Sequence, residues 1–117
     1  MADTPGYELD LRDGTIIARL TEPEVTHLIM QELCVDLEQK VRYDNIHHFV
    51  FDLAEVRFLP SACLGAMVEF MRDLEHVRGR IALAGCEDNV AFLFKVTRLD
   101  SVFPIFDDVD DALAAAA

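Results

Sequence analysis

The sequence predicts an α/β fold built on a mixed sheet. Two short segments of alternating apolar and polar residues stand first, and a glycine-containing turn separates them. After them, segments with helical apolar spacing alternate with short apolar runs typical of buried strands. Strands that alternate with helices need crossover connections, which make a sheet mainly parallel. We therefore expect the order β-β-α-β-α-β-α-β-α.

The first two strands form a predicted hairpin. Tyr7–Leu11 alternates apolar and polar side chains, as a half-buried strand does. The next residues form a turn, in which Gly14 can take the positive φ that a tight hairpin requires. Thr15–Leu20 is then the returning strand.

The first helix is predicted to begin at a capping box. Thr21 can accept a hydrogen bond from the backbone of Glu24, whose side chain can reach back, and Pro23 falls in the first turn. The helix should end between residues 42 and 45. Its expected buried face consists of Val25, Leu28, Ile29, Leu33, Leu37 and Val41.

The later elements follow from apolar runs and from glycine and proline positions. Phe49–Leu53 is nearly all apolar, so we expect it at the centre of the sheet. Pro104 cannot donate to a neighbouring strand, which places the last strand at an edge. Gly79 should stop the second helix. The expected elements are a helix over Ala62–Arg78, a strand over Arg80–Gly85, a helix capped by Asp88, a strand over Val102–Phe106 and a helix over Asp107–Ala117.

Length and charge restrict the function. A chain of 117 residues suggests one domain over residues 1–117. The net charge of -12 disfavours binding to nucleic acid and to anionic lipids. The first residues lack the features of a secretory signal, and no apolar run approaches the ~20 residues of a membrane span. The three cysteines are widely spaced, which argues against a disulfide framework. We expect a cytoplasmic protein without membrane insertion.

Motifs for metals, cofactors and catalysis are missing. His47 and His48 are adjacent, so in a strand they point to opposite faces and cannot easily share a metal ion. The acidic run Asp107–Asp111 lacks the glycine and the distal glutamate of a calcium loop, and fits a helix start better. Phosphate-binding glycine motifs and a nucleophile elbow are also absent. We therefore expect no metal, no cofactor and no enzymatic activity.

One segment stands out as a possible interaction site, Phe58–Gly65, which joins a strand to a helix. Ser61 is either the N-cap of this helix or a modification site, where a phosphate would meet free backbone N–H groups. Cys63 is either a small buried residue or a thiol whose pKa the helix start lowers.

The helix after Ser61 has a wide apolar zone. Leu64, Met67, Val68, Met71 and Leu74 lie within one arc that suffices to face the sheet. A second strip lies beside it and is covered either by a neighbouring helix or by a protein partner. We predict that Phe70 is at least partly exposed and contacts the partner. This second strip contains Cys63, Ala66, Phe70 and Val77.

These features jointly resemble one family, the STAS domain, named for sulfate transporters and anti-sigma factor antagonists. The resemblance covers about Tyr7 to Ala114 and implies a single domain, a mixed sheet with an N-terminal hairpin, and helices packed mainly on one side. The segments that carry it are Phe49–Leu53, Val56–Leu59 before Ser61, Leu64–Gly65, Gly79–Leu83, Val96–Phe106 and Asp111–Leu113.

The resemblance also implies a function. A free-standing domain of this length looks like a bacterial anti-sigma factor antagonist, which binds an anti-sigma factor and so frees a sigma factor. The anti-sigma factor is often a serine kinase that phosphorylates a residue at the strand-to-helix junction. In such a partner-switching system, ATP belongs to the kinase. The alternative is a STAS module within a transport or sensing complex. The resemblance assigns no oligomeric state.

The junction departs from the family motif, which usually reads Asp-Ser-Ser/Thr-Gly-Leu-Gly. Ala62 occupies the usual acceptor position, Pro60 replaces the aspartate, and Cys63 replaces the first glycine. Ser61 matches the first serine of the motif. Either Ser61 is the phosphate acceptor of a shifted variant, or binding is not regulated by phosphate. The partner-binding candidates are Ser61, Ala62, Cys63, Ala66 and Phe70.

Overall fold

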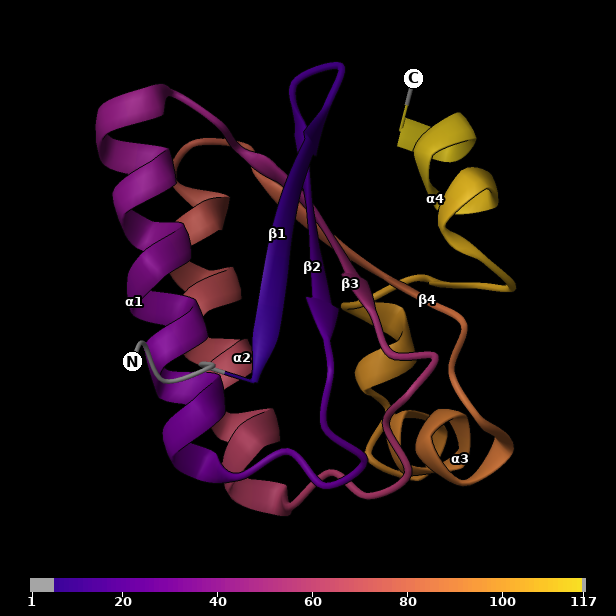
Figure 1. The fold of residues 1–117 in the computed structure, drawn as a ribbon. Helices are drawn as coiled ribbons and strands as arrows, with labels where there is room; N and C mark the ends of the chain where they lie inside the picture. Colours follow the sequence, from indigo (N-terminus) through magenta and orange to yellow (C-terminus); the bar gives the residue numbers. More distant parts are fainter. Residues whose placement is uncertain (1–5, 117) are drawn as a thin grey trace.

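The computed structural model describes residues 6–116 and contains one mixed sheet with the order β1-β2-β3-β4-β5 (Figure 1). β1 (Tyr7–Arg12) and β2 (Thr15–Leu20) form an antiparallel hairpin. β3 (His48–Asp52), β4 (Arg80–Ala84) and β5 (Ile105–Phe106) add to it in parallel. The predicted hairpin, the central position of the third strand and the edge position of the last strand are confirmed.

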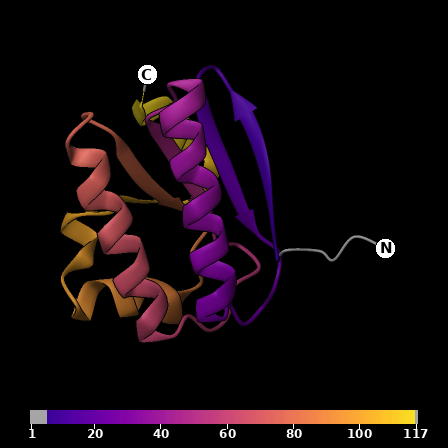
Figure 2. The same ribbon diagram turned by 90° about the vertical axis from the view of Figure 1, so that its left-hand side faces the viewer.

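The helices lie on both faces of the sheet, and the two longest helices share one face. α1 (His27–Asp44) and α2 (Ser61–Glu75) run side by side over one face (Figures 1 and 2). α4 (Val109–Ala116) packs on the opposite face, against β3 and β4. α3 (Asp88–Val96) follows β4, and a short 3₁₀ turn at Leu99–Ser101 leads towards β5. The expected one-sided packing therefore holds for the two long helices.

Two apolar layers hold these elements together. Because side chains alternate along a strand, Phe49 and Phe51 of β3 point to the side of α1 and α2, and Val50 points to α4. The side of the long helices holds the larger layer, which includes Leu33, Met67 and most other buried residues. The smaller layer on the other side consists of Ile17, Val50, Ala84 and Ala112, with partly buried neighbours.

The predicted start of the first helix is wrong. α1 begins at His27, and its N-cap is Thr26, whose hydroxyl accepts from the backbone N–H of Ile29 at 3.1 Å. Thr21 instead extends the hairpin, since its N–H donates to Gly6 at 3.0 Å, and its buried hydroxyl has no partner among residues 6–116. Glu24 pairs with a distant loop and so cannot complete a capping box.

The second helix also differs from its predicted limits. α2 ends at Glu75, before the expected Arg78, because the backbone N–H groups of residues 76–78 donate to carbonyls only three residues back. Arg78 then adopts a left-handed conformation with φ 58°. Gly79 follows and donates its N–H to Leu74 at 2.8 Å. A Cβ atom at Gly79 would lie 2.6 Å from the carbonyl oxygen of His47, so only glycine fits there.

The last three elements differ from their expected limits. Glu87, not Asp88, occupies the N-cap position of α3, although its side chain makes no capping bond. β5 starts at Ile105, because Val102 belongs to the turn that closes the 3₁₀ segment. α4 starts at Val109, and Asp108 accepts a hydrogen bond from the backbone of Asp111, so the acidic run caps a helix as predicted. Ala117 lies outside the described residues.

Leu28 contradicts the predicted buried face of α1. Its side chain is 64% exposed, and Met30 and Cys34 fill the core instead. The later start of α1 does not change which of its residues share a helical face. Neighbouring elements cover only part of the predicted face, and Leu28 lies outside the covered part. Within residues 6–116, no helix is both long and apolar enough to cross a membrane.

Candidate functional site

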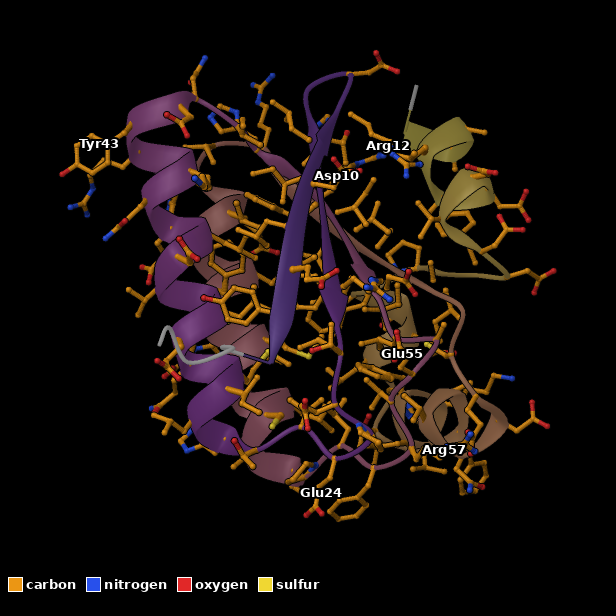
Figure 3. The ribbon with its side chains drawn as sticks, viewed as in Figure 1. Asp10, Arg12, Glu24, Tyr43, Glu55 and Arg57 are labelled. Atoms are coloured by element: carbon orange, nitrogen blue, oxygen red, sulfur yellow. The ribbon has the colours of Figure 1, made fainter. Side chains whose placement is uncertain are left out.

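The junction between β3 and α2 lies where three loops meet at the carboxyl ends of the parallel strands. Arg57 and Phe58 both donate their backbone N–H groups to the carbonyl of Pro23, at 2.7 and 3.0 Å. The N–H of Val25 returns a bond to Phe58 at 3.2 Å, and Glu24 and Phe58 form a parallel β-bridge. The loop before α1 thus holds the loop before α2 (Figure 3 labels Glu24 and Arg57 at this end of the molecule).

A side-chain contact ties the third loop to the same place. The guanidinium of Arg57 donates to the carboxylate of Glu87 at 3.1 Å, and Glu87 precedes α3. Leu53 donates its N–H to Ala84 at 2.9 Å, which extends the pairing of β3 and β4 past their ends. These bonds fix the backbone shape of the junction before any partner arrives.

Ser61 is the first residue of α2 and not its N-cap. Pro60 holds the N-cap position with extended backbone angles and makes no side-chain capping bond. The N–H of Cys63 donates to the carbonyl of Pro60 at 2.9 Å. Ser61 and Ala62 are both exposed, and the Ser61 hydroxyl is not used to stabilise the helix. A capping role therefore does not explain Ser61.

Cys63 is not part of any accessible surface. Its side chain is fully buried, and its thiol donates to the carbonyl of Val25 at 3.5 Å. Burial raises the pKa of the Cys63 thiol, the opposite of a reactive helix-start cysteine. Burial also raises the pKa of Cys34 to about 12 and that of Cys86 to about 11. Of the two alternatives for Cys63, a small buried residue or a reactive thiol, the first is confirmed. The predicted contact of Cys63 with a partner is wrong, because its side chain is not accessible.

The prediction that Phe70 is exposed is also wrong. Only 3% of its surface is accessible, and its ring meets that of Phe49 edge to face, with centroids 5.5 Å apart. The neighbouring helix α1 covers the second apolar strip of α2, as the packing of Cys34 against Ala66 illustrates. Ala66 remains partly exposed and Val77, which follows the end of α2, is 38% exposed, so these are the members of the strip that a partner can still reach; of the two, Ala66 lies nearer to Ser61.

Phe58 is the apolar residue of the junction that the helical-wheel argument missed. It is 56% exposed, although it sits on the loop with the most backbone hydrogen bonds. The signal in the sequence was its position, because Phe58 lies outside any periodic apolar face and only three residues before Ser61. We call Phe58, Ser61, Ala62 and Ala66 the junction surface.

An acidic groove continues from this surface along α1 and α2. Ala62, Gly65 and Ala66 provide small side chains on the α2 side, and His27 and Val35 lie on the α1 side. Its volume is about 1170 Å³. Arg72 is its one lysine or arginine, against five carboxylates, which are Glu32, Asp36, Glu38, Glu69 and Asp73. This charge favours a basic partner.

Metal binding finds no support in the described part of the chain. Among residues 6–116, no group of three or more histidine, cysteine, aspartate or glutamate side chains is placed to hold an ion. His48 is the first residue of β3, and His47 precedes the strand. The junction surface offers hydroxyl, methyl and phenyl groups, which suit contact with a protein surface.

Comparisons with known proteins agree with this architecture. The model of the STAS domain family matches residues 7–112. The structure of the anti-sigma factor antagonist SpoIIAA in its unphosphorylated form has a TM-score of 0.82, with 19% identity over 94% of this chain and 95% of that chain. An anti-sigma factor antagonist from Mycobacterium paratuberculosis has a TM-score of 0.78, with 24% identity over 93% and 91%. A sulfate transporter family protein from Wolinella succinogenes has a TM-score of 0.70, with 18% identity over 92% and 88%.

Proposed function

Because the chain belongs to the STAS domain family, we propose that it is an anti-sigma factor antagonist. It binds an anti-sigma factor in the cytoplasm, thereby frees a sigma factor, and acts by binding without a catalytic step of its own. The fold shared with SpoIIAA supports this proposal. The observation that carries it is the junction surface, where Phe58 and Ser61 are exposed together on a backbone held by hydrogen bonds.

Phe58 is the anchor of this contact. An aromatic side chain buried at the centre of an interface commonly contributes more than ~1 kcal/mol to binding. Because hydrogen bonds to Pro23 and Val25 already fix its loop, little conformational entropy is lost on binding. The partner therefore presents an apolar recess for Phe58 and basic side chains towards the acidic groove.

Phosphorylation of Ser61 by the anti-sigma factor, acting as a serine kinase, would end the contact. The hydroxyl is exposed and lies in the first turn of α2, where free N–H groups and the helix dipole accommodate a phosphate. Folding therefore tolerates the added charge. The partner does not, because the phosphate lies three residues from the Phe58 anchor and changes the charge that the partner meets.

The test is a calorimetric titration of the purified chain with the anti-sigma factor kinases of its source organism. We expect one of them to bind, Phe58→Ala to weaken that binding at least tenfold, and Phe92→Ala to leave it unchanged. Phe92 is a matched control, since it is 64% exposed but lies on α3. Equal affinities for wild type and Phe58→Ala would refute the junction surface, and failure of every kinase to bind would refute the function.

The regulatory step has its own measurement. Incubation with the bound kinase and ATP, followed by mass spectrometry, should place one phosphate on Ser61. Ser61→Asp should lose affinity, whereas Ser61→Ala should retain it. An intact Ser61 after incubation, together with equal affinities for both variants, would show that the contact is not controlled by phosphate.

A further inference from the structure

The sheet face under α4 carries a row of three hydrogen-bond donors. Thr15 of β2 pairs with His48 of β3, and His48 pairs with Arg80 of β4. Thr15 lies two residues before Ile17 in β2, and His48 lies two residues before Val50 in β3. Ile17 and Val50 pack on the side of α4. Side chains two apart in a strand share a face, so the three polar side chains point to the side of α4. We call Thr15, His48 and Arg80 the donor row.

A cavity of about 330 Å³ lies beside the donor row. Its walls on this side are apolar, and they come from Val50 and Ala82 of the sheet and from Phe106, Ala112 and Ala115 around α4. This volume is at the lower end of the range found for small-molecule sites. The cavity can therefore hold a small apolar body.

The cavity continues around the edge of β4. β5 pairs only with Leu83 and Ala84, so the first half of β4 has no strand neighbour on that side. Met71, Val102 and Pro104 line the cavity there. The apolar space is consequently a groove that continues around this edge, and an elongated molecule suits it better than a round one.

Charge distinguishes this cavity from the other two grooves of the molecule. His48 and Arg80 are its only ionisable lining residues, whereas the groove between α1 and α2 is lined by five carboxylates and the groove beside β1 and β2 by six. In a chain with 22 acidic and 10 basic side chains, a cavity without a carboxylate stands apart. An anionic group meets no repulsion from its lining.

The donors of the row are also free to bind. Among residues 6–116, neither Arg80 nor His48 forms an ion pair, in contrast to Arg12, Arg19 and Arg57. Thr15 is only 6% exposed, and its hydroxyl makes no hydrogen bond to another described residue. Among residues 6–116, only the Thr21 hydroxyl is both fully buried and without a partner, so the Thr15 hydroxyl is open to solvent and can exchange a hydrogen bond to water for one to a ligand.

We propose that this groove binds an amphiphilic carboxylate, with the carboxylate on the donor row and the apolar chain along the groove. The planar guanidinium of Arg80 can hold both oxygens of a carboxylate; His48 lies beside Arg80 on the neighbouring strand, and Thr15 lies beside His48 on the strand after that. The apolar chain then replaces water between β4 and α4. The site lies on the opposite face of the sheet from α1 and α2, so it is independent of the junction surface.

Titration of ¹⁵N-labelled protein with decanoate, followed by heteronuclear NMR, tests the proposal. We expect saturable shifts at Arg80, Ala82 and Ala115, and no saturable shift in the groove between α1 and α2. Decanol, which has the same chain without the charge, and butyrate, which has the charge on a short chain, should each bind about tenfold more weakly or worse.

Variants complete the test. Arg80→Met should weaken decanoate binding about tenfold or more, while Arg42→Met, which removes an exposed charge from the last turn of α1, should change it less than about twofold. Ala115→Trp should block the groove without removing a donor. Equal binding of decanoate and decanol, or equal binding by wild type and Arg80→Met with a native spectrum, would overturn the proposal.

Discussion

Truncation of Phe70 tests whether α1 truly seals the apolar strip of α2. With 3% of its surface accessible, Phe70 is a core residue, and Phe→Ala at such a site costs ~3–5 kcal/mol. The edge-to-face contact with Phe49 contributes a further ~0.5–1.5 kcal/mol. For 117 residues the unfolding entropy corresponds to ~0.25 kcal/mol per degree, so the melting temperature should fall by at least ~12 °C.

Urea denaturation monitored by circular dichroism measures this loss directly. Phe92→Ala is the control, because Phe92 is 64% exposed and its truncation should cost less than ~0.5 kcal/mol. If Phe70→Ala does not fold, Phe70→Leu keeps most of the apolar volume and should lose ~1–2 kcal/mol. A melting temperature for Phe70→Ala within 3 °C of wild type, which corresponds to ~0.75 kcal/mol, would mean that Phe70 is accessible and that α1 does not cover it.

Three further predictions concern stability. Gly79→Ala should strongly destabilise the fold, because the new Cβ would lie 2.6 Å from a carbonyl oxygen. Gly65→Ala, which has open space around it inside α2, should instead raise the free energy of unfolding by ~0.5–1 kcal/mol, and thermal melts of both variants test this. Thr26→Ala should cost ~1 kcal/mol in urea denaturation because it removes the N-cap of α1, and Thr21→Val should cost less. Desolvation, and then the hydrogen bond to a carboxylate, raise the pKa of Tyr7 to about 12 from its ordinary value of 10. The stability that the neutral Tyr7 hydroxyl contributes is therefore complete below pH 10 and is lost as the pH rises through 12. Denaturation of Tyr7→Phe should not show that loss.

The sequence predicted the sheet because its signals are local. The strand over Phe49–Leu53 is apolar on both faces, and the edge strand contains Pro104, which cannot donate to a neighbour. Boundaries were less certain because they depend on distant partners. The capping box at Thr21 is intact in the sequence, but Glu24 pairs with Phe58, which is 34 residues away along the chain. Such competition between a local motif and a long-range contact is invisible without the fold.

The candidate site was predicted in position but not in composition. A helical wheel shows which residues of α2 share a face, but it does not show which neighbour covers that face. Phe70 and Cys63 were therefore assigned to a partner, although α1 and the sheet already bury them. Phe58 belongs to no wheel, because it lies in a loop. Ser61 and Ala62, which were chosen for their position at a helix start, are both exposed, and that position is a local feature of the sequence.

The backbone ties between the two loops of the junction bear on how this protein could change partners during evolution. Pro23, Val25 and Phe58 are joined through main-chain atoms, which every residue type carries except for the N–H of proline. The shape of the junction therefore does not depend on the phenyl ring of Phe58 or on the hydroxyl of Ser61. Paralogues that exchange these two side chains would keep the same backbone frame and present a different chemical surface on it. A change in binding specificity therefore needs only one or two substitutions and carries no cost in folding.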